Sequence, residues 1–265
     1  MQTDTPPWWG TFEIPIGSAG SFRIGPCMLE LERLPGELCV ATHDSGDDDD
    51  DVLEITVPAA SVANLAEREH VRRCALADDI TELTISAQLA DEAVVASPRK
   101  PVSIPATGAL TMYIGSPVWL RLEAGKFGHP LLDLPLRQPP KTWFGPSARH
   151  GELCYASRTH SRLRLDDLSV RPHRAITCVE VKNRAHTPFV LDVLKLPVPY
   201  LGLYRAENGA LWTQDVVLER DDREFSPLEI RSGAPRHANN AVRESEPRRS
   251  SNNLMVRAFS SLFSS

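Results

Sequence analysis

Four basic side chains at alternate positions are the residues of this chain with the clearest capacity for chemistry. They are Arg158, His160, Arg162 and Arg164. Successive side chains of a β-strand point to opposite faces, so a strand through these residues would display all four in one cationic row. Like charges in a row repel one another. The row therefore requires an anionic partner, carboxylates on a neighbouring strand, or full solvation.

The sequence leaves these alternatives open. The same alternation points Leu163 and Leu165 inward, on the face opposite the cationic row. Solvation of the row, or its pairing with acids such as Glu180 or Asp192 across the sheet, is the simpler interpretation. The functional interpretation is that the row binds an anionic ligand or an acidic protein surface, and we carry it forward as a hypothesis.

Nucleophilic and metal chemistry find little support in the sequence. Cys154 has His150 and His160 near it along the chain, but an extended strand would hold these residues apart, and no third group orients them. The eight histidines do not cluster at metal-ligand spacing. The acidic run at residues 47–51 lacks the alternating oxygen ligands of a calcium loop, so we interpret it as a solvated loop. We expect no catalytic residue, no metal and no cofactor.

Aromatic side chains offer a possible carbohydrate platform. The candidates are Trp8, Trp9, Trp119, Trp143, Phe144 and Trp212. Sandwich cores use tryptophan routinely, and residues 143–146 stand where a chain would lock onto a second sheet. We therefore favour a structural role for these residues.

Charge limits the class of partner. The net charge is -6, and duplex DNA or RNA requires a broad basic surface, so we expect no duplex nucleic-acid partner. Residues 149–174 differ from the rest, with six arginines against three acids and hence a local charge of +3. An anionic partner would meet the chain there.

The elements that must position these residues are short strands. The 22 prolines fall between short apolar runs, among them residues 110–114, 118–122, 177–182 and 216–219. Residues 207–209 (Glu-Asn-Gly) are typical of a hairpin turn between residues 201–203 and 211–213. Many short strands without intervening helices predict an all-β protein of antiparallel β-sandwich architecture, with two sandwich-like domains.

Composition predicts the domain boundaries. Residues 1–124 would form the first sandwich, and residues 125–140, rich in proline and glycine, a connection. Residues 141–231 would form a second, immunoglobulin-like sandwich, although one large sandwich is the alternative. Residues 232–253 contain no apolar run and predict a flexible linker.

The last segment, residues 254–265, has amphipathic character. On a helix, one apolar face would carry Met255, Phe259, Leu262 and Phe263. A helix this short is marginal alone, so we expect it to order only against a membrane surface, as a weak peripheral contact, or against a partner protein.

Five cysteines bear on the compartment. They are odd in number, widely spread, and form neither a CxxC pair nor a compact disulfide framework. We interpret them as buried reduced thiols of a cytoplasmic protein.

A family resemblance accompanies these patterns. Its residues are Trp9, Gly10, 22–26, 117–122, 142–146 and 151–156. Over residues 8–230 the chain resembles the domain-of-unknown-function family 432 of archaea and bacteria. The resemblance implies no established activity and no catalytic residue. Because members are sometimes encoded beside small mechanosensitive channels, it also implies an accessory role at a membrane channel.

Two functions of different class follow. The first is a non-catalytic binding or regulatory module that docks an acidic protein surface or anionic ligand on the cationic row. The second is an enzyme that acts on a polyanionic or carbohydrate substrate held by the same residues. A cleft where Glu152 or Asp166 meets the row would favour the enzyme, and a flat open sheet would favour the module.

Overall fold

Short strands dominate the protein, as a computed structural model shows. The structure describes residues 7–59, 65–126, 128–147, 149–158, 160–222 and 228–250. Within these ranges the only helical elements are single 3-10 turns, at Leu65–Glu67, Leu165–Asp167 and Val198–Tyr200. Most strand pairs are antiparallel, so the predicted all-β, antiparallel fold class is confirmed. No helix in the described ranges has the length and apolar character needed to cross a membrane.

The chain divides into two compact units that interleave along the sequence. The first unit draws on residues 1–88, 118–137 and 171–173, and the second on the remainder. This division differs from the predicted domains 1–124 and 141–231 because strand β10 (Ala109–Ala124) serves both units. Pro117 suggested a break between two strands. It lies instead within one strand, where β10 exchanges one neighbour for another.

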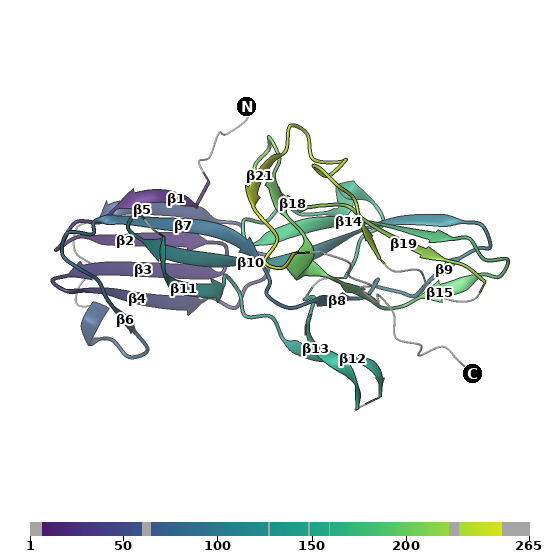
Figure 1. The fold of residues 1–265 in the computed structure, drawn as a ribbon, viewed down its shortest axis with the longest axis horizontal. Coiled ribbons are helices and arrows are strands. Elements are labelled where there is room, and N and C mark those ends of the chain that lie inside the picture. The colour runs from purple at the N-terminus through teal and green to yellow at the C-terminus, as the bar shows by residue number, and fades with distance from the viewer. Residues whose placement is uncertain are drawn as a thin grey trace. The chain divides into compact units, whose positions relative to one another are not determined.

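The first unit is a sandwich of two sheets (Figure 1). One sheet has the order β5 (Leu53–Ala59), β2 (Ala19–Ile24), β3 (Cys27–Leu34), β4 (Glu37–Asp44), β6 (Arg72–Ala75). The other contains β1 (Gly10–Glu13), β7 (Glu82–Leu89), the second half of β10 and β11 (His129–Pro135). Phe12 of β1 meets Phe22 of β2 edge to face, with ring centroids 5.0 Å apart. Alternate apolar residues of both sheets are buried between them.

The second unit is built around β14 (Arg174–Asn183). Its neighbours are the first half of β10, which is antiparallel, and β18 (Leu211–Thr213) and β19 (Val216–Arg220), which are parallel. The outer strands are β17 (Leu203–Arg205), β20 (Glu229–Ile230) and β21 (Val242–Ser245). The predicted hairpin at residues 207–209 is confirmed, because β17 pairs with β18 and Gly209 has the φ of +81° that its turn requires.

Strand β21 corrects the expectation of a flexible linker at residues 232–253 over its described part, residues 232–250. It pairs with β17, and the segment before it is held by ion pairs from Arg231 to Glu180 and from Arg236 to Asp215. Polar composition indicated disorder, yet this segment is ordered largely by backbone hydrogen bonds and charges. The predicted amphipathic residues Met255, Phe259, Leu262 and Phe263 lie outside the described residues.

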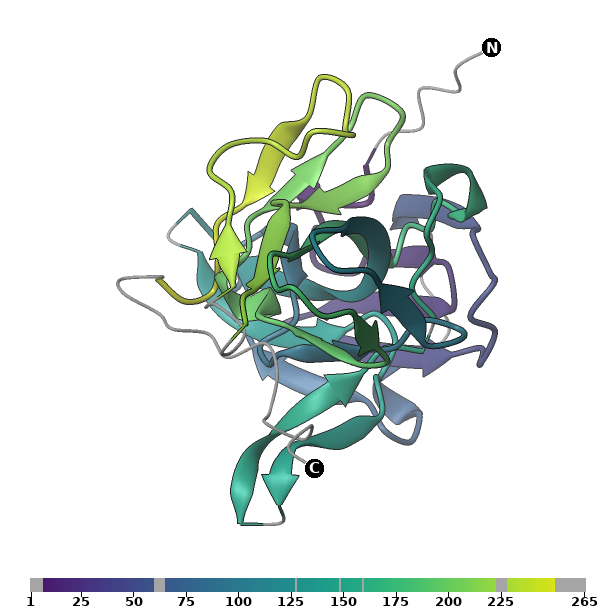
Figure 2. The ribbon, with the colours of Figure 1, turned by 90° about the vertical axis from the view of Figure 1, so that its right-hand side faces the viewer.

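A smaller sheet of the second unit positions the candidate site. Its order is β12 (Lys141–Ser147), β13 (His150–Ala156), β8 (Val94–Ala96), β16 (Leu194–Leu196). Beside it β9 (Val102–Ile104) pairs with β15 (Phe189–Leu191). The β12–β13 hairpin extends away from the other strands of its unit in both ribbon views (Figures 1 and 2).

Candidate functional site

The cationic row expected on one strand face does not form. Strand β13 ends at Ala156, and among the described residues that follow, isolated bridges join Ser161 to Pro98 and Arg162 to Tyr113. The backbone N–H of Arg162 donates to Tyr113 O at 2.9 Å, and that of Ser161 donates to Ser97 O at 3.1 Å. These bridges to two different segments turn the chain, so its side chains do not alternate across one sheet.

Leu163 and Leu165, which were expected to point inward, are exposed instead. Leu163 is 47% exposed and Leu165 is 37% exposed, because the chain has left the sheet and begins a 3-10 turn at Leu165. Arg164 is exposed there, and its Nη2 lies 3.6 Å from Asp166 Oδ2. The suggested partner Glu180 instead accepts hydrogen bonds from Arg231. The four basic residues therefore do not act as one group.

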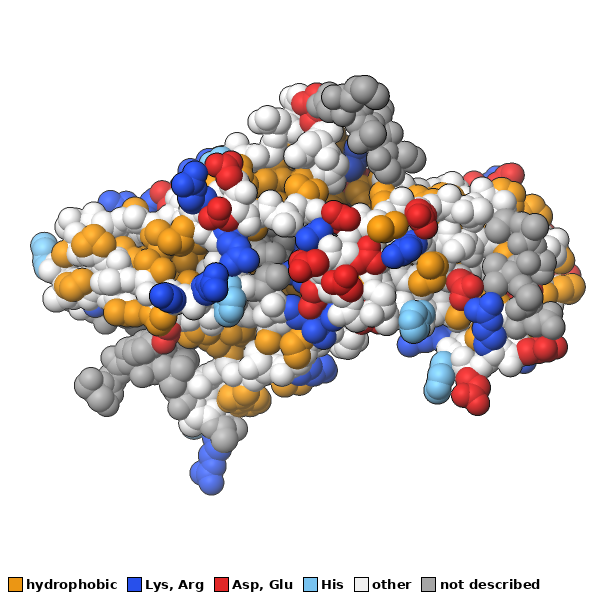
Figure 3. Space-filling model, turned by 180° about the vertical axis from the view of Figure 1, so that it is seen from behind, with side chains coloured by type: hydrophobic (Ala, Val, Ile, Leu, Met, Phe, Trp, Pro, Cys, Tyr) orange, Lys and Arg blue, Asp and Glu red, His pale blue; other side chains and the backbone are white. Residues whose placement is uncertain are grey.

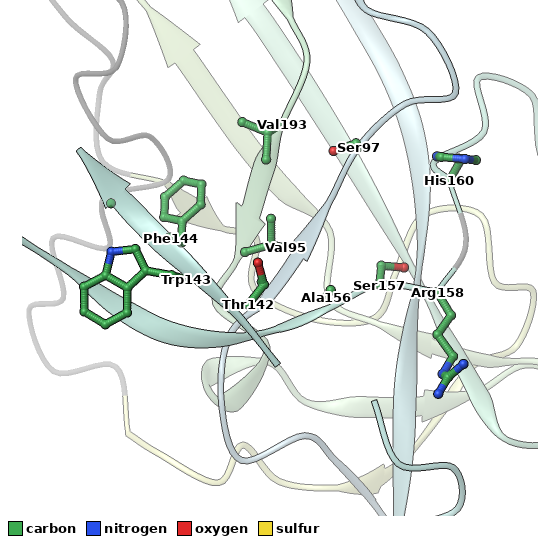
Figure 4. Close-up of a pocket in the computed structure, with 11 residues that line it drawn as sticks. Val95, Ser97, Thr142, Trp143, Phe144, Ala156, Ser157, Arg158, His160 and Val193 are labelled. Atoms are coloured by element: carbon green, nitrogen blue, oxygen red, sulfur yellow. The ribbon is translucent and has the colours of Figure 1, made fainter. Parts of the chain in front are cut away.

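Two of the four meet at a pocket in the second unit. The pocket has a volume of about 420 Å³ and is lined by Val95, Ser97, Thr142, Trp143, Phe144, Gly145, Ala156, Ser157, Arg158, His160 and Val193. Figure 4 shows Arg158 and His160 toward one end of it and the rings of Trp143 and Phe144 toward the other. Arg162 and Arg164 do not line it.

The floor of the pocket follows from strand pairing. Strand β13 runs parallel to β8, which places Ala156 opposite Val95. Thr142 stands on β12, beside β13, and Val193 immediately precedes β16. These small and β-branched side chains leave room above the sheet, and their hydrocarbon makes the middle of the pocket apolar. Because β8, the β12–β13 hairpin and β16 come from distant parts of the chain, the pocket has no single local sequence motif.

Arg158 lines one end of the pocket. Its Nη2 donates to the backbone O of Gln138 at 3.2 Å, which orients the guanidinium plane. A guanidinium carries five N–H donors in a fixed fork that matches carboxylate and phosphate oxygens. His160 adds an imidazole to the same lining. None of the residues that line the pocket is a carboxylate. The charge of the lining is therefore positive.

Trp143 forms an exposed aromatic platform, although the sequence favoured a structural role for it. Its side chain is 49% exposed, whereas Trp8, Trp119 and Trp212 are buried as expected. The indole Nε1–H donates to Ser147 O at 2.9 Å. A Cβ on Gly151 would lie 2.6 Å from that nitrogen, so the ring packs directly on the glycine backbone. The indole is thus fixed on one side and exposed on the other.

Glu152, the acid of the β12–β13 hairpin, is already engaged. Glu152 on β13 forms an ion pair with the buried Lys195, whose Nζ also lies 5.5 Å from the ring centroid of Phe144. This pairing neutralises the single acid of the β12–β13 hairpin.

The acidic run at residues 47–51, in the first unit, is ion-paired rather than only solvated. Arg171, for example, reaches Asp49 and Asp51 at 3.1 Å each.

The described residues offer no arrangement for nucleophilic or metal chemistry at this site. Burial raises the pKa of the Cys154 thiol to about 11, so it stays protonated at neutral pH and is a poor nucleophile. Ser147 Oγ lies 3.2 Å from His150 Nδ1, but it also accepts the backbone N–H groups of the turn, which is a structural use. No group of three or more potential metal ligands occurs in the described part of the chain.

Comparison with known proteins gives a match to a protein family. A family model with the description "Protein of unknown function (DUF432)" matches residues 8–264, nearly the whole chain. No curated protein and no solved structure gives a significant match. The match extends past residue 230, the end of the resemblance expected from the sequence.

Proposed function

The chain belongs to the DUF432 family, whose description states no activity, and we propose from its own geometry that it is a binding module for an anionic ligand with an apolar body. One observation carries this proposal. The pocket joins Arg158 and His160 to the exposed indole of Trp143, with no carboxylate in its lining. The second unit would recognise the ligand.

The chemistry of the lining selects the ligand class. A guanidinium at one end of the pocket binds carboxylate or phosphate oxygens through charge-assisted hydrogen bonds. The hydrocarbon of Val95, Ala156 and Val193 and the face of Trp143 suit an apolar or aromatic body. Polyhydroxylated sugars require many planar polar groups, and no carboxamide or carboxylate lines the pocket. A carboxylate or phosphate attached to an apolar group fits best, on a small molecule or on an acidic protein segment.

Binding is favoured over catalysis for a specific reason. The enzyme alternative requires carboxylates beside the cationic residues as general acids or bases. Glu152 is instead paired with Lys195, and Asp166 lies beside Arg164, away from the pocket lining. We place this binding function in the cytoplasm. The five cysteines are all free thiols, which a reducing compartment maintains.

Phenyl phosphate tests the proposal because it joins an anion to an aromatic ring. Calorimetric titration of the full chain should show binding of phenyl phosphate at least about tenfold tighter than of inorganic phosphate or of phenol. Arg158→Glu should weaken phenyl phosphate binding by about tenfold or more, because it replaces the cation with a repelling anion.

Arg164→Glu is the matched control. Arg164 carries the same charge in the same short segment and is exposed, but it does not line the pocket. It should leave the affinity unchanged. Equal loss in both variants would mean that general electrostatic attraction acts instead of a pocket, and equal affinity in both would remove the proposed site.

A further inference from the structure

The outer face of the β12–β13 hairpin carries an exposed apolar pair, of which only Trp143 also lines the pocket. Trp143 and Leu153 stand directly opposite each other in the antiparallel register. They are 49% and 46% exposed, although both are large hydrophobic residues. Leu153 does not line the pocket. We name the pair, with Lys141 two residues before Trp143 on the same face, the hairpin face.

The charge of the hairpin is opposite to that of the protein. Between residues 141 and 156, Lys141 and Arg149 outnumber the single acid Glu152, so the hairpin carries +1 on a chain of -6. Glu152 is itself paired with Lys195. Figure 3 shows hydrophobic side chains on the hairpin and a basic side chain at its free end. An anionic surface would therefore attract this part of the second unit in preference to the rest of the chain.

Addition of a partner strand is disfavoured at this place. Within the described residues β12 pairs with β13 alone, so its other edge is available. That edge is short, its register shifts between Phe144 and Ser147, and residue 146 is a proline, which has no N–H to donate. A bulge, a proline and a lysine are the devices by which proteins prevent pairing at an edge strand.

The size of the hairpin face favours a lipid bilayer over a protein partner as its occupant. A stable protein interface buries about 800 Å² on each partner, which two half-exposed side chains cannot supply. Shallow insertion into the interfacial layer of a bilayer requires much less, and tryptophan is favoured there because its ring is apolar and its N–H is polar. Basic residues beside it gain from anionic headgroups.

From these observations we infer that the β12–β13 hairpin docks on the surface of an anionic lipid bilayer. Trp143 and Leu153 enter the interfacial layer, and Lys141 and Arg149 face the headgroup phosphates. The ring of Trp143 is already fixed by Ser147 and Gly151, so little conformational freedom is lost on docking. This inference goes beyond the proposed function because Leu153 and Lys141 lie outside the pocket.

Vesicle sedimentation of the full chain tests the inference. Vesicles of phosphatidylcholine with about one third phosphatidylglycerol should pellet the protein, and pure phosphatidylcholine vesicles should pellet much less. Leu153→Ser should lower the partition coefficient about fivefold. Lys141→Glu should lower it by roughly thirtyfold, since the charge changes by two.

Leu163→Ser is the matched control. Leu163 is 47% exposed, lies between two arginines and is outside the hairpin, so its substitution should change the partition coefficient less than about twofold. Equal pelleting of wild type and Leu153→Ser would overturn the inference, as would equal pelleting on neutral vesicles. A dimer that depends on Leu153 in sedimentation velocity, without vesicle binding, would assign the face to a second copy instead.

Phenyl phosphate titration of the same variants separates this inference from the proposed function. Leu153→Ser should bind phenyl phosphate as wild type does, because its side chain is outside the pocket. Loss of vesicle binding with an intact pocket concerns the hairpin face alone. Failure of phenyl phosphate to bind any variant would remove the pocket and leave the vesicle result standing.

Discussion

Arg33 of the first unit is buried, yet main-chain carbonyls meet most of its hydrogen-bonding capacity. Its Nη1 donates to Leu34 O and Glu37 O at 2.6 and 2.8 Å, and its Nη2 to Leu76 O and Ala77 O at 3.2 and 2.7 Å. The nearest carboxylate, Asp78, is 3.9 Å away and mostly exposed. Arg33 thus ties the β3–β4 turn to the chain that follows β6.

Arg33→Lys should destabilise the first unit by about 2–4 kcal/mol. A lysine ammonium has three donors at one point and cannot reach four carbonyls on two segments, so buried acceptors lose their partners. Urea denaturation followed by circular dichroism measures the change. Arg73→Lys is the control, since Arg73 is exposed and pairs with Glu37, and its midpoint should stay at the wild-type value. A wild-type midpoint for Arg33→Lys would show that the carbonyl contacts contribute little.

At the scale of elements, the segment between β20 and β21 acts as a polar clamp on the β14 sheet. Arg236 Nε donates to Asp215 Oδ2 at 2.7 Å, and Tyr113 Oη lies 3.0 Å from His237 Nδ1. Ala238 joins the buried cluster that contains Trp212. Asp215 is buried, and its second oxygen, Oδ1, has no hydrogen-bond partner. The clamp therefore depends on the Arg236 ion pair.

Arg236→Ala should lower the stability of the second unit by about 2–3 kcal/mol, because it leaves a buried carboxylate uncompensated. The predicted loss of stability is smaller than for a fully buried ion pair because Arg236 is 43% exposed. Asp215→Asn combined with Arg236→Ala should recover at least half of the loss, since the buried charge is then absent. Chemical denaturation of both variants decides the matter. No recovery in the double variant would mean that Arg236 acts through packing rather than charge.

Local signals predicted the elements better than they predicted the site. The Glu-Asn-Gly turn before β18 was predictable because its geometry depends on Gly209 and its neighbours alone. The clamp was not, because its order depends on charges that sequence places far apart, such as Asp215 and Glu180. Arg158 and His160 were recognised as candidates, whereas Trp143 was considered as a platform but assigned a structural role. Its exposure depends on the pairing of β13 with β8, which no single segment encodes.

At the scale of the whole molecule, the predicted first domain supplies strands to both units, and β10 belongs to each in part. Residues 89–117 supply β8, β9 and the first half of β10 to the second unit. The first half of β10 pairs with β14 from Ala109 opposite Lys182 to Pro117 opposite Arg174. The predicted connection at residues 125–140 is therefore not a division between independent halves, because a cut there removes the central partner of β14.

A chain cut at that connection tests the interleaving directly. The fragment of residues 141–265 should fail to fold, because β14 loses β10 while β13 and β16 lose β8, which leaves long unpaired edges. The fragment of residues 89–265 keeps every strand of the second unit and should give a dispersed amide NMR spectrum. Both fragments end at the same residue. They differ by β8, β9, β10 and β11, of which β11 and the second half of β10 belong to the first unit. A soluble 141–265 fragment with dispersed amide signals would show that the second sandwich folds without residues 89–117.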